Sequence, residues 1–111
     1  MAENITKIPQ NVLVDAIKYT IEETNDVLID GNQVCIGLIT YADGKIQLDK
    51  NIGEGCKPQV LMHELIHAIT AARMPIDFEQ DENYVDALAS GVVNLIRQNP
   101  ELVDYIRGVE K

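Results

Sequence analysis

The first half of the chain has one segment with a helical pattern, followed by segments with a strand pattern. Leu13, Ile17 and Ile21 recur every four residues among polar positions, and Pro9 suits the first turn of a helix. This spacing predicts a helix over residues 9–24. Asp-Gly pairs then separate short β-branched runs, which predicts an antiparallel meander of about three strands. These strands are expected at residues 27–29, 34–41 and 46–48, with the middle one apolar on both faces and therefore covered on both sides.

The second half of the chain is helical in pattern. Residues 50–55 are expected to be a loop, and the run over residues 58–73 is apolar almost all round, which is typical of a buried helix. Asp77 and Gln80 suggest a capping box for the next helix, which ends at Asn99. One face of that helix is expected to contain Val85, Leu88, Val92 and Ile96. A short helix over residues 101–107, ended by Gly108, is expected last.

These elements predict an α+β fold. We expect a single domain over residues 1–111, with a small antiparallel sheet packed on the buried helix and two to three further helices. The formal charge of -9 disfavours direct contact with nucleic acid, because the phosphate backbone is also negative. The chain has no apolar run long enough for a membrane span. Cys35 and Cys56 do not make a disulfide framework, so each is expected to be a small buried residue of a cytoplasmic protein.

The candidate chemistry lies in the buried helix. His63 and His67 are the only two histidines, and a four-residue spacing puts both rings on one helical face, where they can bind one metal ion. Glu64 follows the first histidine and can act as general base towards a water molecule activated by the metal. A buried histidine pair beside a carboxylate needs an ion or hydrogen-bond partners, since isolated buried charges are very unfavourable. Metal binding is therefore expected in place of a purely structural network.

A third ligand has to come from another residue type. The absence of a third histidine excludes a three-histidine zinc site, and Cys35 and Cys56 would make the site softer and less hydrolytic. The acidic run over residues 77–82 is the better source. Glu82 is favoured within it, because Asp86 lies one turn further along the same helical face and could orient a ligand histidine. Asp77, Glu79 and Asp81 are interpreted as a solvated helix start.

Two segments in this order resemble a known family. Residues 63–67 (HELIH) and 82–89 (ENYVDALA) resemble the small gluzincins of the ImmA/IrrE-like metallopeptidase group, although Val85 stands where Ala is usual and Leu88 where Phe is usual. The resemblance covers about residues 41–89. It implies one zinc ion per chain, and the ligands it implies are His63, His67 and Glu82. It likewise implies that Glu64 is the general base and that Asp86 hydrogen-bonds a ligand histidine.

The resemblance also implies how a substrate would be handled. Thermolysin-like enzymes stabilise the oxyanion with Tyr or His, and Tyr41 and Tyr105 are the candidates for that role in this sequence. Substrates in the family lie extended along the sheet edge, so the strand over residues 46–48 is expected to pair with the substrate. Relatives cleave DNA-binding repressors or act within phages and mobile elements. Together with the acidic composition, this implies a basic or DNA-binding protein substrate.

Three functions follow from these patterns. The leading one is a cytoplasmic zinc metallopeptidase of narrow specificity. The alternative is a catalytically silent, zinc-containing acidic module that sequesters a basic protein, although a purely structural site has no need of Glu64. The third is a latent peptidase whose cleft is covered by residues 100–111.

Overall fold

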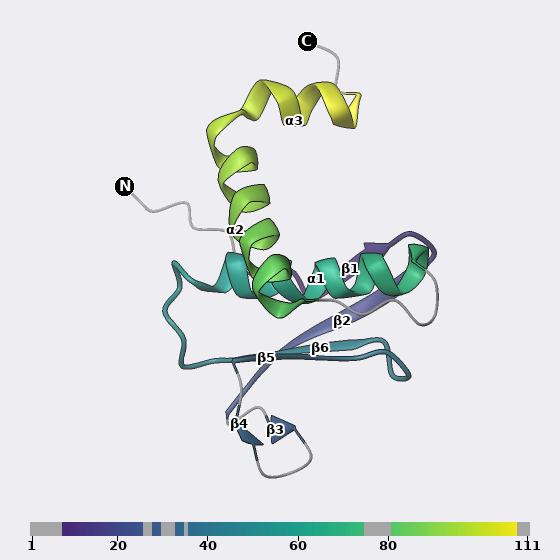
Figure 1. Cartoon of the computed structure of the whole chain (residues 1–111), viewed down its shortest axis with the longest axis vertical. Coiled ribbons are helices and arrows are strands. Elements are labelled where there is room, and N and C mark those ends of the chain that lie inside the picture. Colours follow the sequence, from purple (N-terminus) through teal and green to yellow (C-terminus); the bar gives the residue numbers. More distant parts are fainter. Residues whose placement is uncertain (1–7, 26–27, 30–32, 35, 75–80, 109–111) are drawn as a thin grey trace.

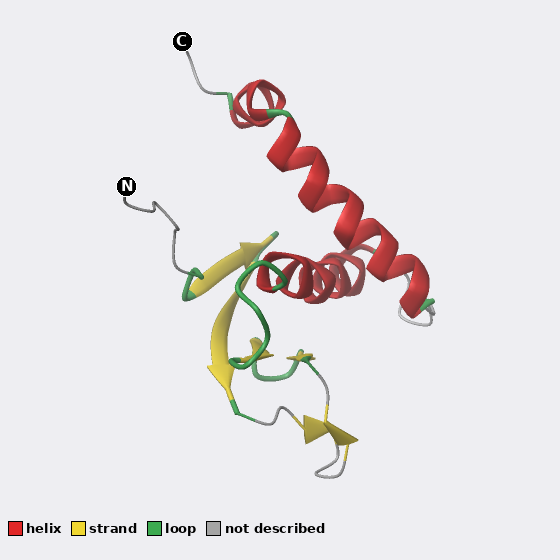
Figure 2. Ribbon diagram, turned by 90° about the vertical axis from the view of Figure 1, so that its left-hand side faces the viewer, coloured by secondary structure: helices red, strands yellow, loops and turns green. Residues whose placement is uncertain are grey.

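The computed structural model of this protein describes residues 8–25, 28–29, 33–34, 36–74 and 81–108. Within these residues the fold is α+β, which confirms the predicted class. Helix α1 packs between a four-stranded sheet and helix α2 (Figure 1, Figure 2). The described strands are β1 (Asn11–Val14), β2 (Ile17–Thr24), β3 (Leu28–Ile29), β4 (Gln33–Val34), β5 (Gly37–Thr40) and β6 (Lys45–Asp49). The described helices are α1 (Lys57–Arg73), α2 (Glu82–Gln98) and α3 (Pro100–Arg107).

The N-terminal segment is a β-hairpin, so the predicted helix over residues 9–24 is wrong. Strands β1 and β2 pair antiparallel. Along β2, Tyr19 and Ile21 are buried while the positions on either side of each are more exposed, which is the two-residue period of a strand. Leu13 and Ile17, which set the apparent helical spacing, are exposed. The segment is rich in β-branched residues, and their packing on one face of the sheet overrides the four-residue spacing.

The main sheet is mixed, where an antiparallel meander was expected. Its strand order is β1-β2-β6-β5, with β6 antiparallel to β5 and parallel to β2. The β5–β6 hairpin is confirmed, and its turn contains Gly44 at a φ of 60°, a conformation that glycine adopts without strain. The expected strands at residues 27–29 and 34–41 are wrong in part. Strand β3 pairs with β4 in a separate two-stranded sheet, and β5 begins only at Gly37.

The strand with the buried side chains is β6, and not β5, which precedes it and was predicted to be covered on both sides. Ile46 and Leu48 are fully buried at the centre of the sheet. The side chains of β5 are only half-buried, because β5 is the last strand on its side of the sheet. The apolar character of β5 therefore reflects the cavity beside it, described below, and not cover on both faces.

Helix α1 is buried on two sides, as its apolar composition predicted. One side packs on the sheet through Val60, Leu61 and Ala68, in the same cluster as the buried β6 residues. The other side packs on α2, where Ile66 and Val85 belong to the same small cluster of buried residues. This double packing places the polar residues of α1 at the junction of sheet and second helix.

The two C-terminal helices end close to the expected positions, but the predicted start of α2 is wrong. Its N-cap is Asp81, which accepts a hydrogen bond from the N–H of Asn83, in place of the expected Asp77. Asp77 and Gln80 lie outside the described residues. The buried residues of α2 are Val85, Ala89 and Val93. The predicted burial of Val85 is confirmed, whereas Leu88 and Ile96 of the predicted face are exposed. Only part of α2 packs on the body of the protein, and the rest of the predicted stripe faces away.

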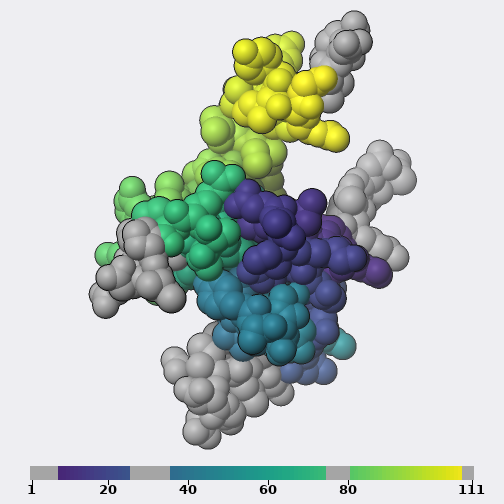
Figure 3. Space-filling model, turned by 90° about the vertical axis from the view of Figure 1, so that its right-hand side faces the viewer, coloured from purple at the N-terminus to yellow at the C-terminus, as the bar shows by residue number. Residues whose placement is uncertain are grey.

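Helix α3 projects from the far end of α2 (Figure 1, Figure 3). It begins at Pro100 and is ended by Gly108 in the left-handed conformation, both as predicted. None of its residues is buried. In the part of the chain that the structure describes, no helix is both long and apolar enough to cross a lipid bilayer.

Candidate metal centre

Helix α1 presents two imidazole rings to the N-terminal end of α2. The ring centroids of His63 and His67 are 5.0 Å apart. Pro58 in the first turn and a run of good helix formers stabilise the helical conformation here. The side chains of His63 and His67 are 19% and 14% exposed, so each ring is largely shielded from water. The predicted four-residue pairing on one helical face is thus present.

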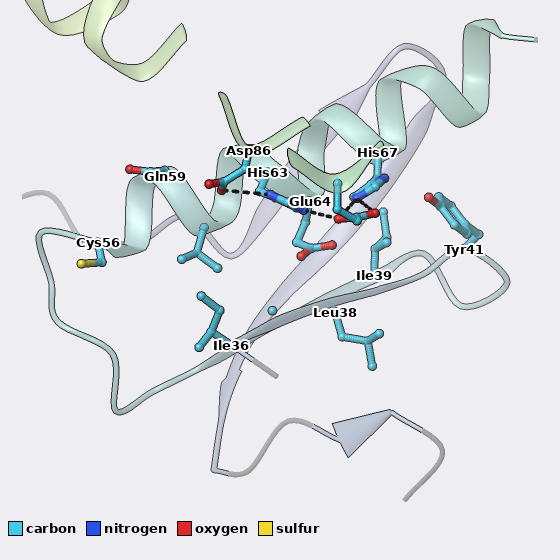
Figure 4. A pocket seen from close by; sticks show the side chains of 13 residues that line it. Ile36, Leu38, Ile39, Tyr41, Cys56, Gln59, His63, Glu64, His67 and Asp86 are labelled. Carbon is cyan, nitrogen blue, oxygen red and sulfur yellow. Dashed lines mark hydrogen bonds and ion pairs between the residues drawn. The ribbon is translucent and has the colours of Figure 1, made fainter. Parts of the chain in front are cut away.

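Glu82 joins the two histidines from the first turn of α2. Its Oε1 lies 2.9 Å from Nε2 of His63 and 3.3 Å from Nε2 of His67 (Figure 4). Partial burial acts to raise the pKa of Glu82. The hydrogen bond with His63 and the charge of His67 outweigh it, so the pKa of this carboxyl lies below its usual value. A carboxylate that stays ionised between two imidazole nitrogens is suited to binding a cation.

These three residues could hold a metal ion. Each offers one donor atom, and the three donor atoms lie within 4.8 Å of one another. Two ligands that bind zinc at about 2.0–2.1 Å in a tetrahedron are themselves about 3.3–3.4 Å apart. The contact between Glu82 and His67 already has this separation, and the 2.9 Å contact with His63 needs to lengthen only slightly. Two of the three separations are therefore close to those of a tetrahedral site, and all three lie within 4.8 Å. Three protein ligands would leave a fourth position of the ion for water or substrate.

Asp86 lies one turn beyond Glu82 and faces His63 from the other side. Its Oδ1 is 3.4 Å from Nδ1 of His63. A carboxylate at this position accepts a hydrogen bond from Nδ1–H of His63, which in a metal-bound form would leave the lone pair of Nε2 for the ion. Glu82 and Asp86 thus lie as the sequence predicts, one turn apart in α2 and both beside His63.

Glu64 projects from α1 towards strand β5 (Figure 4). Its residue is only 7% exposed, and it lines the same cavity as the two histidines. Burial raises the pKa of Glu64, while positive charge on His63 and His67 opposes that rise. A buried carboxylate of raised pKa beside a metal-binding group is suited to accepting and returning a proton.

These side chains line a cavity of about 710 Å³. Its walls come from β5, α1 and the first turns of α2 (Figure 4). Besides the residues above, the lining consists of Ile36, Gly37, Leu38, Ile39, Tyr41, Cys56, Gln59 and Val60. Apart from Tyr41 and Cys56, these lining residues carry no signal in the sequence, because their nearness to the histidines depends on how α1 crosses the sheet.

Only one of the two candidate tyrosines is in this cavity. Tyr41 follows β5 and lines the cavity at one end, with its residue 49% exposed. Burial of the ring raises the pKa of Tyr41, and nearby Tyr19, Glu64 and Glu82 raise it further, so the hydroxyl remains a proton donor. Tyr105 is 82% exposed on α3 and does not line the cavity.

The cysteine predictions have a mixed outcome. Cys56 is exposed at the start of α1 and lines the cavity, so the expected burial of this residue is wrong. The reason is its place at the N-cap of α1, at the edge of the packed core. Cys35 lies outside the described residues, as do Asp77 and Glu79 of the acidic run.

The strand that borders the cavity is β5, so the expected substrate-pairing strand at residues 46–48 is wrong. That segment lies within β6, which is hydrogen-bonded on both sides to β2 and β5. Among the described strands of this sheet, β5 has a neighbour on one side only. Its other side is turned towards the cavity (Figure 4).

The expected cover over the cleft is not present in the described part of residues 100–111. Helix α3 packs on α2, and none of its residues lines the cavity. The cavity is lined by Glu82 and Asp86 in the first turns of α2, whereas α3 follows the other end of that helix (Figure 1).

Removing either of the two carboxylates around His63 is expected to weaken metal binding, but to different extents. Glu82→Ala removes a ligand and should abolish measurable binding. Asp86→Ala leaves all three ligands in place and should weaken binding by about 10–100-fold, because His63 loses the group that orients it. Titration calorimetry with Zn²⁺, Co²⁺ and Mn²⁺ measures both effects. Asn83→Ala, an exposed neighbour, is the matched control, and wild-type affinity in Asp86→Ala would contradict the orienting role.

Comparisons with models of known protein families, with curated proteins and with solved structures found no match to this chain.

Proposed function

We propose that this protein is a cytoplasmic zinc-dependent endopeptidase of gluzincin type. The observation that carries the proposal is the convergence of His63, His67 and Glu82 with the buried Glu64 in one cavity beside an edge strand. A metal-binding group alone would fit a structural role equally well. The adjacent buried carboxylate and the open cavity are what favour hydrolysis.

Zinc is the proposed metal because two imidazoles and one carboxylate are a common ligand set of hydrolytic zinc sites. When bound, zinc polarises a carbonyl group and activates a water molecule at the open position. His63, His67 and Glu82 would bind the ion, and Asp86 would keep His63 in the tautomer that binds. Glu64 would take a proton from the attacking water and return it to the leaving amine.

Strand β5 is the proposed docking edge for the substrate. Its free side faces the cavity, so an extended peptide could add to the sheet there through main-chain hydrogen bonds. Ile36 and Ile39 on this wall offer apolar contacts. The formal charge of -9 favours a basic protein as the substrate, and the family resemblance points to DNA-binding proteins of that kind.

The test is cleavage of a peptide library by protein loaded with one equivalent of Zn²⁺. We expect cleavage, enriched at peptides with Lys and Arg, that is lost after chelation and restored by added zinc. Mass spectrometry of the products reads out both cleavage and sequence preference. No cleavage by protein shown to contain one zinc per chain would reject the peptidase and favour the sequestering module.

Tyr41→Phe is expected to lower kcat by about 10²-fold, the usual loss when one hydrogen-bond donor to the oxyanion is removed. The pKa of Tyr41 is raised, so its hydroxyl stays protonated at neutral pH and the donor is retained to a higher pH than for an ordinary tyrosine. The measurement is kcat against pH for the wild type and the variant. Tyr105→Phe, which alters a residue outside the cavity, is the matched control. Equal kcat in Tyr41→Phe and the wild type would remove Tyr41 from the mechanism.

A further inference from the structure

Strand β5 crosses the buried carboxylate of Glu64 at a glycine. A Cβ atom added at Gly37 would lie 2.9 Å from Oε2 of Glu64 and 3.0 Å from Cγ1 of Val60. Both separations are shorter than ordinary van der Waals contact, which begins at 3.4 Å. The φ angle of Gly37 is outside the left-handed region, so the backbone conformation does not require glycine here. Gly37 is required by space alone.

We propose that Gly37 is a positioning residue for Glu64. Because Gly37 has no side chain, the β5 backbone can lie directly against the Glu64 carboxylate and fix its place beside His63 and His67. This inference rests on the proposed function, in which Glu64 moves the proton. It adds a residue of β5 to the helical residues that would bind the metal and move the proton.

The surroundings determine which group would move if a side chain were added. The β5 backbone is held by its pairing with β6, where Gly37 lies opposite Leu48, and by a 2.9 Å hydrogen bond from the N–H of Asp49 to the carbonyl of Ile36. Val60 is a buried residue with a stiff side chain. The flexible end of Glu64 is therefore the part that yields.

The Glu64 carboxylate has to move only a short distance, but the expected effect of this movement on the reaction rate is large. To restore a contact of 3.4 Å from 2.9 Å, the Glu64 carboxylate has to move by about 0.5 Å. A misplacement of about 1 Å can lower a rate by about 10²-fold, since proton transfer depends on alignment. Gly37→Ala should therefore affect the chemical step far more than binding of the metal, because the atoms nearest to the added Cβ belong to Glu64 and Val60 and not to the three metal-binding residues.

The first test compares the kinetics of Gly37→Ala with those of Gly53→Ala. A Cβ at Gly53 meets nothing within 4 Å, so this matched control should behave as the wild type. For Gly37→Ala we expect kcat to fall by about 10–100-fold, with KM and the Kd for Zn²⁺ changed by less than about twofold. A kcat within twofold of the wild type overturns the proposal, and so does a loss explained by weaker zinc binding.

The second test needs no peptidase activity and so separates this proposal from the proposed function. It is a double-mutant cycle of melting temperatures in metal-free protein, with Gly37→Ala placed in the wild type and in Glu64→Ala. We expect Gly37→Ala to lower Tm by about 5 °C in the wild type and by less than half of that in Glu64→Ala, where the crowded carboxylate is gone. Equal shifts in both backgrounds would show that Gly37 does not act through Glu64.

A third pair of variants keeps the proposal testable if Gly37→Ala does not fold. Val60→Ala removes the other crowded contact, so Gly37→Ala should be tolerated in that background. Relative to Val60→Ala, the double variant is expected to show the same 10–100-fold fall in kcat. Wild-type-like kcat in the double variant would mean that Val60, and not Glu64, is the group that Gly37 accommodates.

Discussion

Glutamine in place of Glu64 is expected to lower kcat by about 10²–10⁴-fold, the usual contribution of a general acid–base group. Glutamine has nearly the shape of glutamate but cannot accept a proton. Glu64 is not part of the His–His–Glu group, so zinc should remain bound at one equivalent per chain. The measurements are kcat on a peptide substrate and zinc content by elemental analysis.

Glu101→Gln is the matched control for this change. Glu101 is exposed on α3 and does not line the cavity, so the same loss of one negative charge should leave kcat unchanged. A biological effect that survives Glu64→Gln intact would contradict the peptidase and favour sequestration of a basic partner. Loss of zinc in Glu64→Gln would contradict the separate roles given to Glu64 and the ligands.

The same substitution should stabilise the metal-free protein at neutral pH. Burial raises the pKa of Glu64 in the folded state, so the folded protein holds this proton more tightly than the unfolded chain does. The stability of the wild type therefore falls as pH rises from the unfolded pKa through the folded one. Glutamine does not titrate, so the variant should be more stable at pH 7 and lose this advantage in acid. Urea unfolding at both pH values measures the difference.

Ile46→Ala is expected to destabilise the protein by about 3 kcal/mol, within the range for aliphatic residues truncated in a packed core. Ile46 is fully buried in the central strand, where it packs in the cluster formed by the sheet and α1. Domains of this size are stable by about 5–15 kcal/mol, so the loss is a large fraction of the total. Urea unfolding should show a lower midpoint with an unchanged slope.

Leu13→Ala is the control for the core substitution. Leu13 is 69% exposed on β1, so its truncation should change the free energy of unfolding by less than about 0.5 kcal/mol. A large effect at Leu13 would mean that another surface covers β1. A small effect at Ile46 would contradict the central position of β6.

The metal-binding helix was the most predictable part of the protein. Its apolar composition required burial, and the spacing of His63 and His67 put both rings on one face whatever the rest of the fold. The placement of Glu82 and Asp86 on one helical face could also be predicted, because they are four residues apart in the sequence. These are local relations within one helix, and local geometry follows from sequence spacing.

The N-terminal half was predicted less well. The spacing of Leu13, Ile17 and Ile21 suits a helix, but only Ile21 is buried. In the structure Ile17 and Ile21 share one face of β2, whereas Leu13 lies on β1 opposite Lys18 and therefore on the other face of the sheet. The strand conformation of β2 also depends on its pairing with β6. That pairing is between segments far apart in the chain, so a local pattern does not determine it.

Spacing along the chain was enough to predict the buried helix, the histidine pair, the adjacent glutamate and the pair of carboxylates in the next helix. It did not predict that β5 is an edge strand beside the cavity, that Tyr41 and not Tyr105 lines the cavity, or that Gly37 lies against Glu64. The difference arises because spacing along a helix fixes which side chains are neighbours within it. Contacts between a helix and a sheet depend instead on strand order and on the crossing of the two elements, and these are set by the packing of the whole core.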